Sequence, residues 1–140
     1  MTADSQWAVQ SALYDSLCGD SQLISLLKNG AESIFDAVPD DAALPCLVMA
    51  GMRTEAFETQ AGGGMKILLS LESYSRYRGM RELKMIMQAV YDHLHGKDDL
   101  LVAGHHVIDC RFLSSRTLMD EDGLTRRAVQ NFEILTEPAL

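Results

Sequence analysis

Residues 107–136 of the chain read VIDCRFLSSRTLMDEDGLTRRAVQNFEILT. Two strand-like segments, Val107–Leu118 and Leu124–Thr136, are each about twice as long as a typical strand. Between them, Asp120–Gly123 favours a type I turn with glycine at the left-handed position. The pattern therefore predicts one long β-hairpin. Because two apolar residues, Ala128 and Val129, are adjacent in the second segment, we expect a β-bulge near Ala128.

The segments before this hairpin have both helical and strand-like patterns. Apolar residues at helical spacing predict a helix from Asp4 to Leu17, with Trp7 counted in its apolar stripe. A clearer stripe predicts a second helix from Met80 to His95. The other elements expected are a short helix at Ser21–Lys28 and strands at 33–37, Cys46–Met52 and Met65–Tyr74. A polar loop is expected from Thr54 to Gly64, and its three final glycines suggest a hinge.

These elements together predict an α+β fold. We expect a mostly antiparallel sheet of about four to five strands, two main helices packed on one face, and the long C-terminal β-hairpin. The chain has 140 residues and no linker rich in proline or serine. We therefore expect residues 1–140 to form a single domain.

The charge distribution limits the partners. Acidic residues number 20 and basic residues 12, giving a net charge of −8. Lys28 is the only cation among residues 1–42, which include many carboxylates. Such a chain repels the phosphate backbone, so sequence-specific binding of nucleic acid is not expected; the acidity also suits a solubilising surface. No apolar run has the length of about 20 residues that a membrane span needs.

The residues that usually carry chemistry are not arranged for it. The three cysteines are widely spaced, and neither histidine pair, His93/His95 or His105/His106, has the spacing of a zinc motif. The paired aspartates are typical of solvated turns. We therefore expect no catalytic residues, no metal and no cofactor. A small-ligand-binding domain or an enzyme that uses Cys46 or His105 remains a competing hypothesis.

A local basic cluster precedes and begins the second main helix. It consists of Arg76, Arg78, Arg81 and Lys84. One interpretation is a solvated turn and helix start. The other is a subunit contact in which arginines meet the acidic residues of a neighbour. Met85 lies off the apolar stripe of the helix and is a further candidate for contact with a partner subunit.

Several segments, taken in order, have the pattern of a known family. They are Val9–Tyr14, Ile34–Pro39, Leu44–Val48, Leu71–Arg76, the helix Gly79–His95, and Asp120–Thr125 followed by Arg126–Ile134. In this order, over about residues 5–136, the chain resembles the phage tail completion, or tail terminator, family of siphophage-like particles and gene transfer agents. Cys46 stands where that family usually has an aromatic residue.

The resemblance implies a structural protein of the virion and not an enzyme. Members of the family are similar to ring-forming tail terminators, commonly hexameric, that cap the tail tube, stop its polymerisation and join it to the head connector. DNA would pass through such a ring without being read. The implied location is the neck or tail end of the virion, and the host cytoplasm during assembly. The alternative within this class is another head–tail component, a stopper or an adaptor.

The implied partners are other copies of the chain, the tail tube protein and the head connector or stopper protein. The glycine-ended loop, the basic turn and the hairpin tip are the segments that we expect to reach them. The candidate contact residues are Thr54, Glu55, Phe57, Glu58, Gly62, Gly63, Gly64, Arg76, Arg78, Asp120, Glu121, Asp122 and Gly123.

Overall fold

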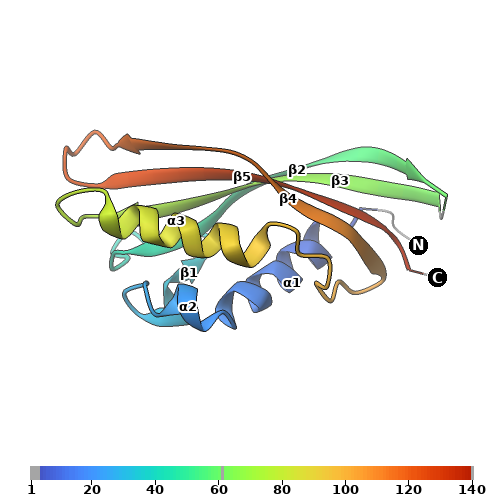
Figure 1. The fold of residues 1–140 in the computed structure, drawn as a ribbon, viewed down its shortest axis with the longest axis horizontal. Coiled ribbons are helices and arrows are strands. Elements are labelled where there is room, and N and C mark those ends of the chain that lie inside the picture. Colours follow the sequence, from blue (N-terminus) through green and yellow to red (C-terminus); the bar gives the residue numbers. More distant parts are fainter. Residues whose placement is uncertain (1–3, 61, 140) are drawn as a thin grey trace.

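A five-stranded sheet with helices on one face makes up the fold (Figure 1). The computed structural model describes residues 4–60 and 62–139. The elements are α1 (Gln6–Cys18), α2 (Ser21–Ile24), the 3-10 helix η1 (Gly30–Ser33), β1 (Ile34–Phe35), β2 (Cys46–Thr59), β3 (Gly62–Ser75), α3 (Arg81–Leu94), β4 (His105–Met119) and β5 (Arg126–Pro138). The α+β class is as predicted, and α1 and α3 lie on the same side of the sheet.

The strands follow one another in the order β1-β2-β3-β5-β4. The pairs β2–β3, β3–β5 and β4–β5 are antiparallel, whereas β1 runs parallel to β2, with Ile34 opposite Leu47 and Phe35 opposite Val48. The prediction of a mostly antiparallel sheet is therefore wrong, because the sheet is mixed. Residues 36–45 carry the chain back to the end at which β1 began, so that β2 runs in the same direction.

The long C-terminal hairpin agrees with the sequence, but the bulge does not lie where we expected it. β5 pairs without interruption with both of its neighbours at Ala128. The register shifts lie in β4, between Val107 and Asp109 and between Phe112 and Ser114. Ala128 and Val129 are both buried although they point to opposite faces. Because both faces of the sheet bury their residue at this point, adjacent apolar residues need no bulge.

The polar segment expected as a loop is the distal part of a second long hairpin. β2 and β3 stay paired from Cys46 opposite Tyr74 out to Thr59 opposite Gly62. The three glycines lie within β3 and not in a hinge. The backbone ladder satisfies its own hydrogen-bonding groups there, so the strands persist without an apolar side-chain pattern.

The hydrophobic core lies between the helices and the sheet. α1 contributes residues four apart, and α3 contributes the stripe that its sequence predicts. Fully buried apolar residues of the two helices and of the central strands include Val9, Leu13, Leu17, Leu83, Ile86, Val90, Leu94, Ile67, Leu71, Phe132 and Ile134. Trp7 was expected in this stripe and is instead 73% exposed. It precedes Val9 by two residues, which places it on another side of the helix.

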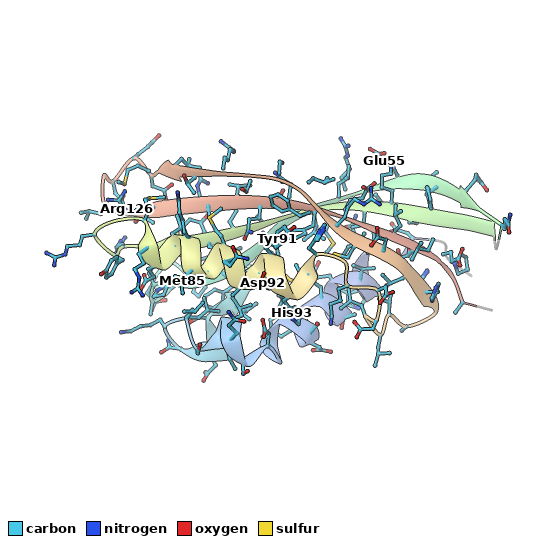
Figure 2. The ribbon with its side chains drawn as sticks, in the orientation of Figure 1. Glu55, Met85, Tyr91, Asp92, His93 and Arg126 are labelled. Carbon is cyan, nitrogen blue, oxygen red and sulfur yellow. The ribbon has the colours of Figure 1, made fainter. Side chains whose placement is uncertain are left out.

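His93 joins the helices to one another and makes their packing sensitive to pH. Its Nε2 lies 2.7 Å from the Ser16 hydroxyl in a hydrogen bond, and its Nδ1 lies 3.6 Å from Asp20 Oδ2. The histidine projects from α3 in Figure 2, and Ser16 and Asp20 belong to the N-terminal helical region. Burial lowers the pKa of His93 from its ordinary value of 6.5, against the opposing effect of Asp20.

We expect acid to destabilise the protein through His93. A lowered pKa in the folded state means that the unfolded chain takes up a proton first, so the stabilisation is complete above about pH 6.5 and is lost as the pH falls. Between about pH 7.5 and pH 5.5, the free energy of unfolding should fall more for the native protein than for His93→Gln. Urea titrations at both pH values measure this difference; an equal fall for the two proteins would contradict it.

Candidate functional site

The predicted contact residues lie at opposite ends of the sheet. The hairpin end is the distal part of β2 and β3, and it holds Thr54, Glu55, Phe57, Glu58, Gly62, Gly63 and Gly64. The turn end consists of the β4–β5 connection and the start of the β3–α3 connection, and it holds Arg76, Arg78, Asp120, Glu121, Asp122 and Gly123. Figure 1 shows the two ends separated along the long axis of the molecule. The structure therefore offers two separate candidate surfaces.

At the hairpin end, part of the predicted set is already engaged within the chain. The Gln6 side chain donates a hydrogen bond of 2.7 Å to the Thr54 hydroxyl, which ties β2 to α1. Phe57 is half-buried and stands opposite Gly64, which is buried. Glu55 accepts an ion pair of 2.7 Å from Arg53. The exposed members of the set are Glu55, Glu58, Gly62 and Gly63.

The β4–β5 connection is ordered by Asp122. Its Oδ1 accepts hydrogen bonds of 2.8 Å from the backbone N–H groups of Leu124 and Thr125, and its Oδ2 accepts one of 2.6 Å from the Thr125 hydroxyl. Gly123 has a φ of +70° and its N–H donates to the Asp120 carbonyl at 3.0 Å. This confirms the predicted left-handed glycine and defines the shape of the turn.

Arginines connect this turn to β3. The Arg76 Nε donates to the Thr125 hydroxyl at 3.0 Å, and a terminal nitrogen of Arg76 lies 3.6 Å from Asp122 Oδ2. Arg127 lies 3.3 Å from Asp120 and 3.6 Å from Glu72. Arg78, in contrast, is exposed and forms no ion pair with any residue that the structure describes. Of the two predicted arginines, Arg78 is thus the freer to meet a partner.

We expect the Asp122 turn to withstand moderate acid. The Thr125 hydroxyl, followed by the two backbone N–H groups, lowers the pKa of Asp122 to about 2 from its ordinary 3.8. The stabilisation is therefore complete above the ordinary pKa and is lost only as the pH falls toward the lowered one. In an NMR titration, the Leu124 and Thr125 amide signals should keep their neutral-pH positions at about pH 3. Asp122→Asn is the control without a titrating carboxyl, and a midpoint near 3.8 would contradict the prediction.

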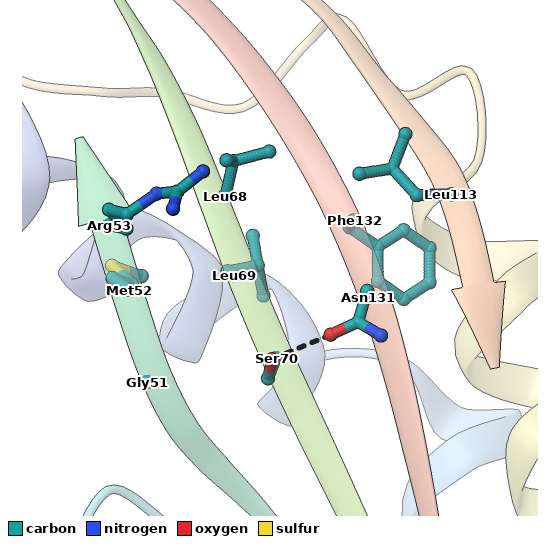
Figure 3. A pocket seen from close by; sticks show the side chains of 9 residues that line it. All are labelled: Gly51, Met52, Arg53, Leu68, Leu69, Ser70, Leu113, Asn131 and Phe132. Carbon is teal, nitrogen blue, oxygen red and sulfur yellow. Dashed lines mark hydrogen bonds between the residues drawn. The ribbon is translucent and has the colours of Figure 1, made fainter. Parts of the chain in front are cut away.

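The face of the sheet turned away from the helices carries a shallow hollow. It has a volume of about 440 Å³ and lies over Gly51, Met52, Arg53, Leu68, Leu69, Ser70, Leu113, Asn131 and Phe132. The Ser70 hydroxyl donates a hydrogen bond of 2.7 Å to the Asn131 side-chain oxygen, drawn as a dashed line in Figure 3. The Asn131 side chain donates in turn to the Ser114 hydroxyl at 3.1 Å. Arg53 is the only titratable residue in this lining. The hollow offers contact surface and no set of catalytic groups.

The competing enzyme hypothesis finds no geometric support. Burial raises the pKa of Cys46 to about 11 and that of Cys110 to about 12, so neither thiol is ionised at neutral pH. Cys46 stands opposite Tyr74, near the turn end of the sheet. His105 stands opposite Pro138, at the other end of the sheet. Within residues 4–60 and 62–139, no three His, Cys, Asp or Glu side chains gather as a metal site would require.

The helices in residues 4–60 and 62–139 include none with the length and apolar composition of a membrane span.

Exposed apolar side chains are the surface feature that sequence reasoning missed. Trp7 and Tyr14 project from α1, and Leu101 and Leu124 lie in connections. The residue types of these four side chains do not indicate that they are exposed. For Trp7 a signal was available, because Val9, Leu13 and Leu17 are spaced by four and define the buried side of α1 without it.

Comparison with known proteins decides the family. The family model described as "Tail completion protein gp17" matches residues 11–137, nearly the whole chain. The chain belongs to the tail completion protein gp17 family. This confirms the resemblance seen in the sequence, and it makes the protein a structural protein of the phage tail and of virion assembly.

The fold of this tail completion protein also has a counterpart among solved structures. It matches a chain of the structure titled "Virion of native gene transfer agent (GTA) particle" with a TM-score of 0.85, at 22% sequence identity, over 97% of this chain and 99% of that one. At this identity the match demonstrates a shared fold. A comparison with curated proteins finds no match.

Proposed function

We propose that this tail completion protein forms a closed ring that caps the tail tube, stops its polymerisation and joins it to the head connector. The observation that carries the proposal is the family match over residues 11–137. The likeness to a chain of a gene transfer agent virion supports a place in the virion, at the neck or tail end. We further propose that residues 1–140 act as one domain.

Ring closure needs two different surfaces on each copy, because a head-to-tail contact with rotational closure makes each subunit use one surface toward each neighbour. The hairpin end and the turn end are different surfaces, since one is the distal part of β2 and β3 and the other is a connection ordered by Asp122. Their separation along the sheet supports a head-to-tail arrangement, which we propose is a hexamer. The candidate contact residues of the two ends belong to this proposal, as do the tail tube and connector proteins as partners.

DNA passes through the proposed ring without being read. The net charge of −8 supports this, because a negative lining repels phosphate groups and leaves the duplex free to move. A protein that held DNA would need a cluster of cations, and its affinity would fall steeply with salt.

Deleting the gene in the producing strain tests the function. Electron microscopy should show tails of excess length, or tails and heads that remain separate, and expression of the protein from a plasmid should restore joined particles. Normal particles in the deletion strain would contradict the proposal.

Native mass spectrometry of isolated necks gives the copy number and the neighbours. A protein that contacts only head components would be a stopper or an adaptor and not the tail terminator.

A further inference from the structure

A groove beside α1 combines exposed aromatic side chains with one acidic side chain, that of Asp36. We call it the α1 groove. It has a volume of about 330 Å³ and is lined by Trp7, Gln10, Ser11, Tyr14, Ile34, Phe35, Asp36 and Met49. Trp7 is 73% exposed and Tyr14 is 38% exposed. Tryptophan and tyrosine are enriched among the residues that dominate protein–protein binding, so their exposure here marks a surface that a partner would cover.

Asp36 is the acidic residue of the α1 groove. It is exposed, and its carboxylate accepts a hydrogen bond of 3.3 Å from the Gln10 side chain. Asp36 takes part in no ion pair within the described part of the chain. Lys28 is the sole cation in residues 1–52. A partner that brings apolar and basic groups together would satisfy both features of the groove.

The same chain carries such a surface at the start of α3, which we call the α3 patch. It consists of Tyr77, Arg78, Arg81, Lys84 and Met85. Tyr77 is 49% exposed and Met85 is 45% exposed, and Met85 projects from α3 on the side away from the sheet (Figure 2). Positions 81, 84 and 85 share one side of the helix.

Among the described residues, the cations of the α3 patch form no ion pairs, as Asp36 of the α1 groove forms none. Arg78, Arg81 and Lys84 are all exposed, and none of them pairs with a carboxylate in residues 4–60 or 62–139. Arginine is enriched in protein interfaces, where its planar group meets carboxylates with two parallel hydrogen bonds. The two surfaces are thus opposite in charge and alike in exposed apolar content.

We propose that the α1 groove of one copy receives the α3 patch of the next copy in the ring. This deepens the proposed function and rests on it. The α3 patch adjoins the turn end, to which Arg78 also belongs, and Gln6 of α1 contacts Thr54 of the hairpin end, so the new contact extends the one proposed between the two ends. The two surfaces share no residue, so each copy can use both at once, and repetition of the same contact closes a ring when the rotations between successive copies add up to a full turn. Charge and apolar content match within a single sequence, which favours a second copy over another virion protein as the occupant.

A charge swap tests the contact in the producing strain. Asp36→Lys and Arg81→Glu each place like charges across the interface, and we expect each to lower the yield of joined particles by about tenfold or more. The chain that carries both substitutions again has opposite charges at positions 36 and 81 in each interface and should recover most of the yield. Asp98→Lys, at an exposed aspartate outside both surfaces, is the matched control and should leave the yield unchanged. Circular dichroism melts of the purified variants confirm that each one folds.

The outcomes separate the contact from the function. If the deletion abolishes joined particles but both single variants support them, the function stands and the contact is overturned. If the single variants fail and the double variant fails equally, the groove meets a different virion protein, and the proposal is again overturned. If the deletion strain itself makes normal particles, the proposed function fails. Loss in both single variants with recovery in the double variant supports the contact.

Discussion

Replacing Phe132 with alanine is expected to lower the free energy of unfolding by about 3–5 kcal/mol. Phe132 lies on β5 in the interior of the sheet and is fully buried. Its ring meets that of Phe112 edge-on, with centroids 5.6 Å apart, and Phe112 meets Tyr91 of α3 in the same way at 5.2 Å. The substitution therefore leaves a cavity at the point where β4, β5 and α3 are joined, and it removes an aromatic contact as well.

Urea unfolding measures this loss, provided that the slope of the transition is the same for both proteins. Leu124→Ala is a suitable control, because Leu124 is 65% exposed and its truncation should change the free energy by no more than about 0.5 kcal/mol. A loss below about 1 kcal/mol for Phe132→Ala would show that the surrounding side chains collapse into the space and that the aromatic cluster is not central to the core.

Shortening the β2–β3 hairpin is expected to lower the yield of joined particles strongly while the fold persists. Glu55 stands opposite Lys66, so Asn-Gly in place of residues 56–65 connects the two strands by a two-residue turn at that register. The shortened chain keeps Thr54 with its Gln6 contact and keeps the buried Ile67. The removed part lies beyond these anchors, and its side chains on β2 are exposed or half-buried where described. Its loss should therefore affect partners more than stability.

The measurement is the yield of joined particles when the shortened chain is expressed in the deletion strain, with a fall of about tenfold or more expected from loss of a central contact. A thermal melt of the purified chain checks the fold. Wild-type yield from a folded, shortened chain would remove the hairpin end from the contact surfaces. The matched control is Glu121→Ala, a change of one exposed side chain at the opposite end of the sheet.

The sequence predicted well those elements whose local structure requires particular residue types at particular positions. α3 shows an uninterrupted apolar stripe because one side of it packs on the sheet. The C-terminal hairpin has a turn sequence whose glycine needs a positive φ, and Gly123 has one. These signals are local, so the residues themselves carry them.

The parts that were missed depend on contacts that are distant in sequence or made by the backbone. β1 has only two residues, and its parallel partner is set by the return of residues 36–45 and not by any pattern within it. The distal part of β2 and β3 is held by a backbone ladder, which a side-chain pattern does not report. Arg76 and Asp122 were both candidates for external contact, yet they lie 3.6 Å apart in the same chain. Only the fold could reveal that pairing.

The direction of the strands has a mechanical consequence. β3 and β5 run between the hairpin end and the turn end and are joined through eleven consecutive residue pairs. Hydrogen bonds in an antiparallel ladder lie across the strands. Tension applied between the two ends therefore loads this ladder in shear, so that its bonds must yield together and not unzip one after another. If neighbouring molecules hold this protein at both ends, a sudden force between them acts along the direction in which the β3–β5 ladder resists separation most strongly.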